Sequence, residues 1–173
     1  MLPAPIPPDD ARRLDSLSRL QLLDTPPEDR FDRITQTAQR LLNAPIALLV
    51  LVDAEREWFK SRQGVETTEA PRTTSLCGHA LLAEDLFVVP DTLRDPRFVD
   101  NPTVIFGPHV RFYAGKPLHS PDGSKVGVLC IEDCRPRQLN RVEEETLRYL
   151  AAWAERELNR PHVTAAPAAR HAT

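Results

Sequence analysis

Cys77 and His79 are the side chains best suited to chemistry, because a thiol and an imidazole stand two residues apart. The surrounding pattern predicts a helix capped by Thr73 or Thr74, with Cys77 in its first turn. Aligned backbone N–H groups at that position lower the pKa of a thiol, so a nucleophilic or redox-sensing Cys77 is one hypothesis. The other is a small apolar core residue, since free cysteine is often buried. We favour the second, because residues two apart on a helix point in different directions, which leaves His79 solvated or capping.

The spacing of the cysteines does not favour a metal site. Cys130 and Cys134 stand four residues apart on a predicted strand, about 13 Å at 3.3 Å per residue, whereas two ligands of one zinc ion lie within about 4 Å of each other. The chain has 3 cysteines, an odd number, which predicts reduced thiols and no disulfide framework. We predict no metal and no cofactor, and an unidentified small molecule remains the candidate ligand.

A second group of polar side chains is suited to binding such a ligand. Arg111 and Tyr113 alternate with apolar neighbours, so both belong to one face of a predicted strand. Asp91, Arg97 and Asn101 stand in a loop that either lines a polar pocket or forms its own network of turns and ion pairs, and we favour the network. Together with Trp58 and a helix start near Ser75, these residues suit a small anion or a planar metabolite. The predicted ligand-binding set is Trp58, Ser75, Cys77, His79, Asp91, Arg97, Asn101, Arg111 and Tyr113.

Hydrophobic spacing and proline predict the elements that position these residues. Residues 46–52 are apolar at every position, which is typical of a central strand covered on both faces. The strands follow one another in hairpins and do not alternate with helices, so the predicted class is α+β with an antiparallel sheet. We expect the helices at the two chain ends on one face, and the third helix and a long loop to form a pocket on the other. The predicted helices are 10–23, 26–42, 74–82 and 142–158, the strands are 46–52, 58–62, 86–89, 110–118 and 126–133, and the long packed loop is 91–108.

Composition narrows the class of protein. The chain has 173 residues, a formal net charge of −3, and 17 prolines against 6 glycines. This charge does not favour a nucleic-acid partner, and no apolar run approaches the roughly 20 residues that cross a membrane, so we expect a cytoplasmic protein without a membrane partner. The prolines predict the boundaries: a flexible tail over 1–9, a single domain over 10–160 and a disordered tail over 161–173.

Several motifs, taken in order, are similar to those of one known family. Leu23 begins Leu-Asp-Thr-Pro-Pro-Glu-Asp-Arg-Phe-Asp, Trp58 begins Trp-Phe-Lys-Ser, and Arg111 begins Arg-Phe-Tyr-Ala-Gly. Further matches are Ser-Leu-Cys-Gly-His-Ala from Ser75, Asp-Pro-Arg-Phe from Asp95 and Pro-Asp-Gly from Pro121. Over about residues 14–158 the chain resembles a GAF domain, of the type found N-terminal in bacterial sensor histidine kinases and diguanylate cyclases.

The resemblance implies a PAS-related antiparallel sheet of five to six strands with a small-molecule cavity in front. The resemblance also implies a regulatory role rather than catalysis. Members of the family bind cyclic nucleotides, tetrapyrroles, haem or small metabolites. The residues associated with cyclic nucleotide binding are missing, and Gly78 separates Cys77 from His79, so the bilin-attaching Cys-His pair is missing too. The free methionine sulfoxide reductases of this fold use further cysteines around the pocket, and no cysteine stands between Glu84 and His109.

We therefore predict a stand-alone, non-enzymatic GAF module that binds a small molecule or signals to a separate histidine kinase or diguanylate cyclase. The alternative is a thiol-based redox sensor, or an enzyme like methionine sulfoxide reductase, that uses Cys77. A third possibility is a domain whose pocket is filled by its own side chains and which serves as an interaction platform. Terminal helices of GAF modules often pair, and Trp153 lies off the main apolar stripe of the last helix, so we also predict a homodimer.

Overall fold

A six-stranded antiparallel sheet forms the centre of the protein. In the computed structural model, which describes residues 1–161, the strand order is β3-β2-β1-β6-β5-β4, and every neighbouring pair is antiparallel. The predicted α+β class and the sheet of five to six strands are confirmed. Only β3 was not indicated, because Glu69–Pro71 has no β-branched or aromatic residue, whereas the equally short β4 is an apolar run. The strands are β1 (Ile46–Val52), β2 (Arg56–Gln63), β3 (Glu69–Pro71), β4 (Phe87–Val89), β5 (Phe112–His119) and β6 (Lys125–Asp133).

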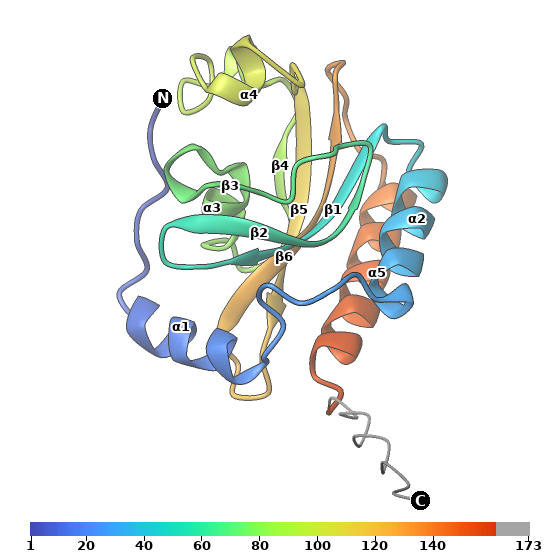
Figure 1. Cartoon of the computed structure of the whole chain (residues 1–173). Helices are drawn as coiled ribbons and strands as arrows, with labels where there is room; N and C mark the ends of the chain where they lie inside the picture. Colours follow the sequence, from blue (N-terminus) through green and yellow to red (C-terminus); the bar gives the residue numbers. More distant parts are fainter. Residues whose placement is uncertain (162–173) are drawn as a thin grey trace, which may run out of the picture.

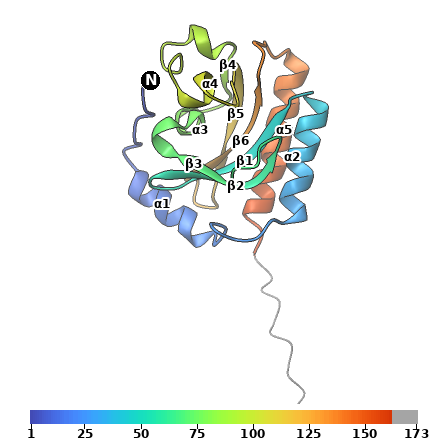
Figure 2. The same cartoon turned by 45° about the horizontal axis from the view of Figure 1, so that its top comes forward.

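Helices cover both faces of this sheet (Figures 1 and 2). The long helices α2 (Asp29–Leu41) and α5 (Arg141–Leu158) lie side by side on one face, and the short α3 (Leu76–Ala80) and α4 (Pro102–Ile105) lie on the other. α1 (Asp10–Arg19) runs along one end of the sheet, so the neighbour of α5 is α2 and not α1. None of the described helices combines the length and the apolar character that crossing a bilayer requires.

The side chains of β1 are all buried and alternate between two cores. We call the core beneath α2 and α5 the back core; it includes Leu49 and Leu51, and Leu17 of α1 also joins it. The core beneath α3 is the front core, and it includes Leu48 and Val50. The predicted central strand, covered on both faces, is confirmed.

The turn between β5 and β6 holds α1 at the end of the sheet. Gly123 takes a φ of +82° in this turn, a left-handed conformation that costs glycine little. Asp122 accepts hydrogen bonds from the hydroxyl groups of Ser16 and Ser120, both at 2.6 Å. The Pro-Asp-Gly motif from Pro121 therefore forms this turn, whose contact with Ser16 also explains why α1 does not lie beside α5.

The loop 91–108 packs against the front core through only part of its apolar residues. It contains a short 3-10 helix, η2 (Thr92–Arg94), and then α4. Phe98 and Val104 are buried as expected, whereas Val99, Ile105 and Phe106 are exposed, Phe106 by 82%. Ile105 and Phe106 lie at the end of a four-residue helix that turns only one side towards the sheet, and Val99 precedes this helix, so the expectation of packing was wrong for these three residues.

The N-terminal segment, residues 2–8, lies along the front of the molecule beside α3 (Figure 1). The Leu2 N–H donates to the Arg97 carbonyl at 3.1 Å, and the Leu2 carbonyl lies 2.9 Å from His79 Nε2. We expected a solvated tail here; the segment contains neither helix nor strand, but it rests on the domain because α3 and Arg97 offer it hydrogen-bond partners. The disordered tail predicted at the other end lies, from residue 162 onward, outside the described residues.

Candidate functional site

Ser75 begins α3 and positions the residues that follow it. Its Oγ accepts a hydrogen bond from the Gly78 N–H at 2.8 Å and donates one to Glu57 Oε2. The helix cap is thus Ser75, while the predicted caps Thr73 and Thr74 lie one turn earlier, in the 3-10 helix η1 (Arg72–Thr74). A short hydroxyl side chain at any of the three positions suits a cap, so spacing alone did not separate them. Cys77 stands in the first turn, as predicted.

Cys77, Tyr113 and Cys130 meet in the front core. The Tyr113 hydroxyl donates to Cys77 Sγ at 3.1 Å, and Cys77 Sγ lies 3.7 Å from Cys130 Sγ. Burial raises the pKa of Cys77 well above its ordinary value and raises the pKa of Cys130 as well. The thiolate is the reactive form of cysteine, so this environment favours the core interpretation of Cys77. Cys134 is exposed and contacts the Pro108 carbonyl instead, at 3.2 Å.

Glu57 is a buried carboxyl group that our sequence prediction missed. It lies on β2 and receives the hydrogen bond from Ser75. Burial raises the pKa of Glu57 to about 7. One signal in the sequence could have indicated this position. Glu57 stands two residues before Phe59, a front-core residue, and side chains two apart on a strand share a face.

Trp58 does not belong to the front of the molecule. It packs in the back core, and its ring lies 5.8 Å from Lys60 Nζ. Because strand side chains alternate, Trp58 points away from the face that carries Glu57 and Phe59. The prediction that Trp58 lies with the other candidate ligand contacts is therefore corrected.

The polar residues of the loop 91–108 are paired with one another and with neighbouring segments. Asp91 accepts two hydrogen bonds from Arg111, both at 3.0 Å, and Asp95 accepts two from Arg97, at 2.9 and 2.6 Å. Asn101 caps α4 by accepting from the Thr103 N–H at 2.9 Å, and its Nδ2 donates to the Thr74 carbonyl at 2.8 Å. These contacts agree with the network of turns and ion pairs that we favoured, but Arg111 and Thr74, which lie outside the loop, also take part in it.

An open groove lies where α3, β4 and Arg97 meet the N-terminal segment. It has a volume of about 570 Å³. Its two rings, His79 and Phe87, are stacked with their centroids 6.4 Å apart, and the Arg97 guanidinium lies 5.0 Å from the centre of Phe87. We call it the front groove, lined by Leu2, Pro3, Pro5, His79, Leu82, Ala83, Phe87 and Arg97.

His79 lies in this groove and not in solvent, which corrects the expectation of a solvated side chain. The N-terminal segment covers it, so that it is 9% exposed. Burial lowers the pKa of His79, and the imidazole is neutral at pH 7. The Leu2 carbonyl can only accept, so Nε2 carries the proton and donates to it.

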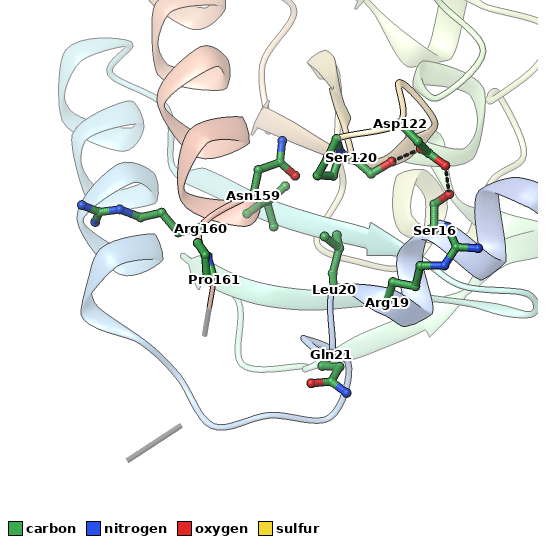
Figure 3. A pocket seen from close by; sticks show the side chains of 11 residues that line it. Ser16, Arg19, Leu20, Gln21, Ser120, Asp122, Asn159, Arg160 and Pro161 are labelled. Atoms are coloured by element: carbon green, nitrogen blue, oxygen red, sulfur yellow. Dashed lines mark hydrogen bonds between the residues drawn. The ribbon is translucent and has the colours of Figure 1, made fainter. Parts of the chain in front are cut away.

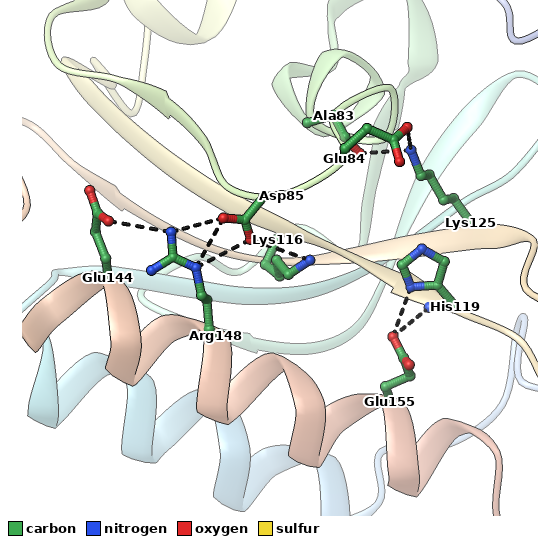
Figure 4. Close-up of polar contacts among 9 residues, drawn as sticks. All are labelled: Ala83, Glu84, Asp85, Lys116, His119, Lys125, Glu144, Arg148 and Glu155. Carbon is green, nitrogen blue, oxygen red and sulfur yellow. Dashed lines mark hydrogen bonds and ion pairs between the residues drawn. The ribbon is translucent and has the colours of Figure 1, made fainter. Parts of the chain in front are cut away.

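Ionic contacts connect the segment after α3 with the rest of the molecule (Figure 4). Asp85 accepts hydrogen bonds from Arg148 of α5 at 3.0 and 2.8 Å, and Lys116 of β5 lies 3.5 Å from the same carboxyl group. Lys125 of β6 donates to the Ala83 carbonyl at 2.7 Å and to Glu84 at 2.8 Å. The wall of the front groove is thereby joined to the helix at the back of the sheet.

A second pocket, of about 530 Å³, lies between α1, the β5–β6 turn and the end of α5 (Figure 3). Ser16 of α1, Asp122 of the β5–β6 turn and Asn159 after α5 line it, and the first two are hydrogen-bonded to each other. None of the predicted ligand-binding residues is among those that line this pocket. The front groove, which His79 and Arg97 line, is therefore the better candidate site.

Comparison with known proteins agrees with this architecture. The family model described as GAF domain matches residues 26–158. The chain belongs to the GAF family. This GAF domain is also 38% identical over 137 residues to a cyclic di-GMP phosphodiesterase of Pseudomonas aeruginosa, a match that covers 79% of the chain and 23% of that protein. The chain thus spans less than a quarter of this relative, and its family makes it a signalling module.

Solved GAF structures share the fold at low sequence identity. The GAF domain of an Acinetobacter phosphoenolpyruvate-protein phosphotransferase has a TM-score of 0.61 at 16% identity, over 85% of this chain and 92% of that chain. A free methionine-R-sulfoxide reductase of Neisseria meningitidis has a TM-score of 0.59 at 20% identity, over 91% and 95% of the two chains. At these identities the likeness shows the fold alone.

Proposed function

We propose that this GAF domain is a non-enzymatic sensor that binds a small molecule in the front groove and regulates an output protein. The front groove is the observation that carries the proposal. The front core is filled by Cys77, Tyr113 and their neighbours, whereas the groove beside it offers about 570 Å³. A pocket of that size, mostly apolar with a few polar groups, is typical of small-molecule sites.

The side chains in the groove favour a planar ligand that carries acceptor oxygens. His79 supplies an N–H donor when the Leu2 carbonyl is displaced, and Phe87 supplies a ring face. Asp95 neutralises the charge of Arg97 through two hydrogen bonds. A ligand with several negative charges would meet little net positive charge here, so a neutral or singly charged metabolite fits better.

The segment Ala83–Asp85 provides a route from the groove to α5. Ala83 lines the groove, and Asp85 is held by Arg148 on α5. An exposed ion pair of this kind contributes only about 0–1 kcal/mol to stability, but paired guanidinium and carboxyl groups fix relative position. A ligand that shifts α3 and Ala83 would therefore also shift α5.

The similarity to the Pseudomonas relative favours an output protein that takes part in cyclic di-GMP signalling. The name of this relative includes a phosphodiesterase activity, and the part that resembles this chain makes up less than a quarter of the relative's length. We propose that the GAF domain controls such a phosphodiesterase, or a diguanylate cyclase or histidine kinase as the resemblance implied. A chimaera in which this chain replaces the matching segment of the phosphodiesterase tests the coupling: Asp85→Asn should change cyclic di-GMP hydrolysis, and the exposed control Glu66→Gln should not.

Ligand binding is tested by native mass spectrometry of the freshly purified protein and by a thermal-shift screen of metabolites. A ligand at one hundred times its Kd stabilises the folded state by about 2.7 kcal/mol. The stabilisation should disappear in His79→Ala and persist in Ser120→Ala, which lies at the other pocket. A protein that retains no small molecule and responds to none of the metabolites would contradict the sensor function.

A thiol-based function is the alternative, and the pair Cys77–Cys130 favours it because the two sulfur atoms are 3.7 Å apart. The raised pKa of both thiols opposes it. The decisive assay is the reduction of free methionine-R-sulfoxide in the presence of a dithiol reductant. Turnover by the wild-type chain that Cys77→Ser abolishes would establish the enzyme and end the non-enzymatic proposal.

A further inference from the structure

We propose that the wall of the front groove formed by His79, Phe87 and Arg97 recognises an extended, proline-rich peptide of a partner protein, and that the chain's own N-terminal segment covers this wall in cis. The inference rests on the proposed function in using the same groove, and it names a class of partner. The first observation is the backbone pairing at Leu2. Its N–H and its carbonyl are both engaged, by the Arg97 carbonyl at 3.1 Å and by His79 Nε2 at 2.9 Å.

Proline suits the rest of the seated segment for a physical reason. Residues 3, 5, 7 and 8 are prolines, which have no backbone N–H. Four of the seven residues therefore bring no N–H that would need a partner on the groove, and the segment lies there without a ladder of hydrogen bonds.

Gly78 gives the segment room to approach α3. A Cβ atom built on Gly78 would lie 3.0 Å from the Cβ atom of Ala4, closer than such atoms normally pack. The segment therefore touches the helix backbone at the one residue of α3 that lacks a side chain. This is a close approach of two chain segments, not merely a tail lying on a surface.

The walls of the groove resemble the surfaces on which proline rings pack. His79 and Phe87 present rings, and the guanidinium of Arg97 lies over Phe87 and Phe98 at 5.0 and 5.1 Å. Aromatic-lined grooves bind preformed extended proline-rich segments at a low entropic cost. The occupant in cis is replaceable, because Leu2 and Ile6, its largest apolar side chains, remain 58% and 61% exposed.

The test compares two full-length variants. Ala4→Glu places a charged side chain against Gly78 and should release the segment, while Ala4→Gly keeps the close approach and serves as the matched control. The probe is a peptide with the sequence of residues 2–9, blocked at both ends, and a second peptide carries alanine at its four prolines. Binding is followed by the amide resonances of Gly78, His79 and Arg97 in labelled protein.

We expect the proline peptide to shift these amide resonances in Ala4→Glu. It should bind Ala4→Glu about tenfold more tightly than Ala4→Gly, because in Ala4→Gly the N-terminal segment still competes at millimolar effective concentration. The alanine peptide should bind at least about fivefold more weakly, since it must lose more freedom to become extended. Releasing the segment should lower the free energy of unfolding of Ala4→Glu by about 1.4 kcal/mol relative to Ala4→Gly, which is the tenfold competition expressed as stability. Both variants should still unfold in one cooperative transition, which shows that the domain is intact.

The proposal is overturned if the proline peptide does not shift the three amides in Ala4→Glu, or if the alanine peptide binds equally well. It is also overturned if wild-type chains form a dimer that Ala4→Glu dissociates, because the site would then serve a second copy. A metabolite found by the thermal-shift screen would still support the sensor function, so the two proposals fail separately.

Discussion

Burial decides what Cys77 can do, although its place in the first turn of α3 is one where thiols are often reactive. Tyr113 and Cys130 enclose its sulfur, and burial raises its pKa. We expect Cys134 to react with a disulfide reagent at the rate of a free thiol, and Cys77 and Cys130 to react at least about 100-fold more slowly, after local opening. The measurement is the time course of thiol release in native protein and in denaturant.

Cys134→Ser supplies the control for this prediction. The variant should lose the fast phase and keep two slow thiols. A fast phase that survives in Cys134→Ser and disappears in Cys77→Ser would contradict the buried assignment and favour the redox alternative.

Glu57 makes the stability of the fold depend on pH. Its pKa is raised from 4.5 to about 7 by burial, so the folded state holds the proton more tightly than the unfolded state. The stabilisation is complete below about pH 4.5 and is lost as pH rises through 7, by about 3 kcal/mol in total. Glu57→Gln cannot ionise, so its free energy of unfolding should fall less between pH 5 and pH 8 than that of the wild type.

Urea unfolding at several pH values checks this prediction. Burial also raises the pKa of Glu132, to about 8, and this shift likewise lowers the free energy of unfolding as pH rises. Glu57→Gln should therefore keep part of the decrease in stability. The exposed control Glu66→Gln should follow the wild-type curve. Parallel curves for Glu57→Gln and the wild type would show that Glu57 does not carry the effect.

At the scale of elements, the start of α3 depends on one hydroxyl group. Ser75 caps the helix and also donates to the buried Glu57. Ser75→Ala should therefore lower the free energy of unfolding by about 1–2 kcal/mol. Thr74→Ala removes only an exposed hydrogen bond to the Pro71 carbonyl and should stay within about 0.5 kcal/mol of the wild type. The measurement is urea unfolding at pH 6. If Ser75→Ala and Thr74→Ala lowered the free energy of unfolding equally, Ser75 would not be the cap of α3.

Long periodic elements were predictable from the sequence, and contacts between distant segments were not. β1 and α5 followed from their apolar spacing. β3 and α4 escaped because both are short and neither carries a recognisable apolar pattern. Trp58 was assigned to the wrong face because one strand residue shows no direction by itself. The pairing of His79 with Leu2 spans 77 positions, and no local pattern contains that information.

At the scale of the whole molecule, α5 offers a surface for the homodimer that we propose. Val142 and Tyr149 are 71% and 68% exposed and stand two turns apart, with Trp153 one turn further. Tyr149→Glu should weaken dimerisation at least about tenfold in sedimentation velocity experiments. Leu93→Glu, on the opposite side of the sheet, is the matched control. A wild-type chain that sediments as a monomer at high concentration would remove the proposal.

The two edge strands of the sheet have a consequence for assembly. β3 and β4 are three residues long, and prolines stand at their ends, Pro71 within β3 and Pro90 directly after β4. Short edges with proline offer few free backbone groups to an incoming strand. Copies of the domain are thus discouraged from joining their sheets into one continuous ribbon. At high concentration the chain should resist fibre formation, and its contacts with other proteins are left to helices and to the front groove.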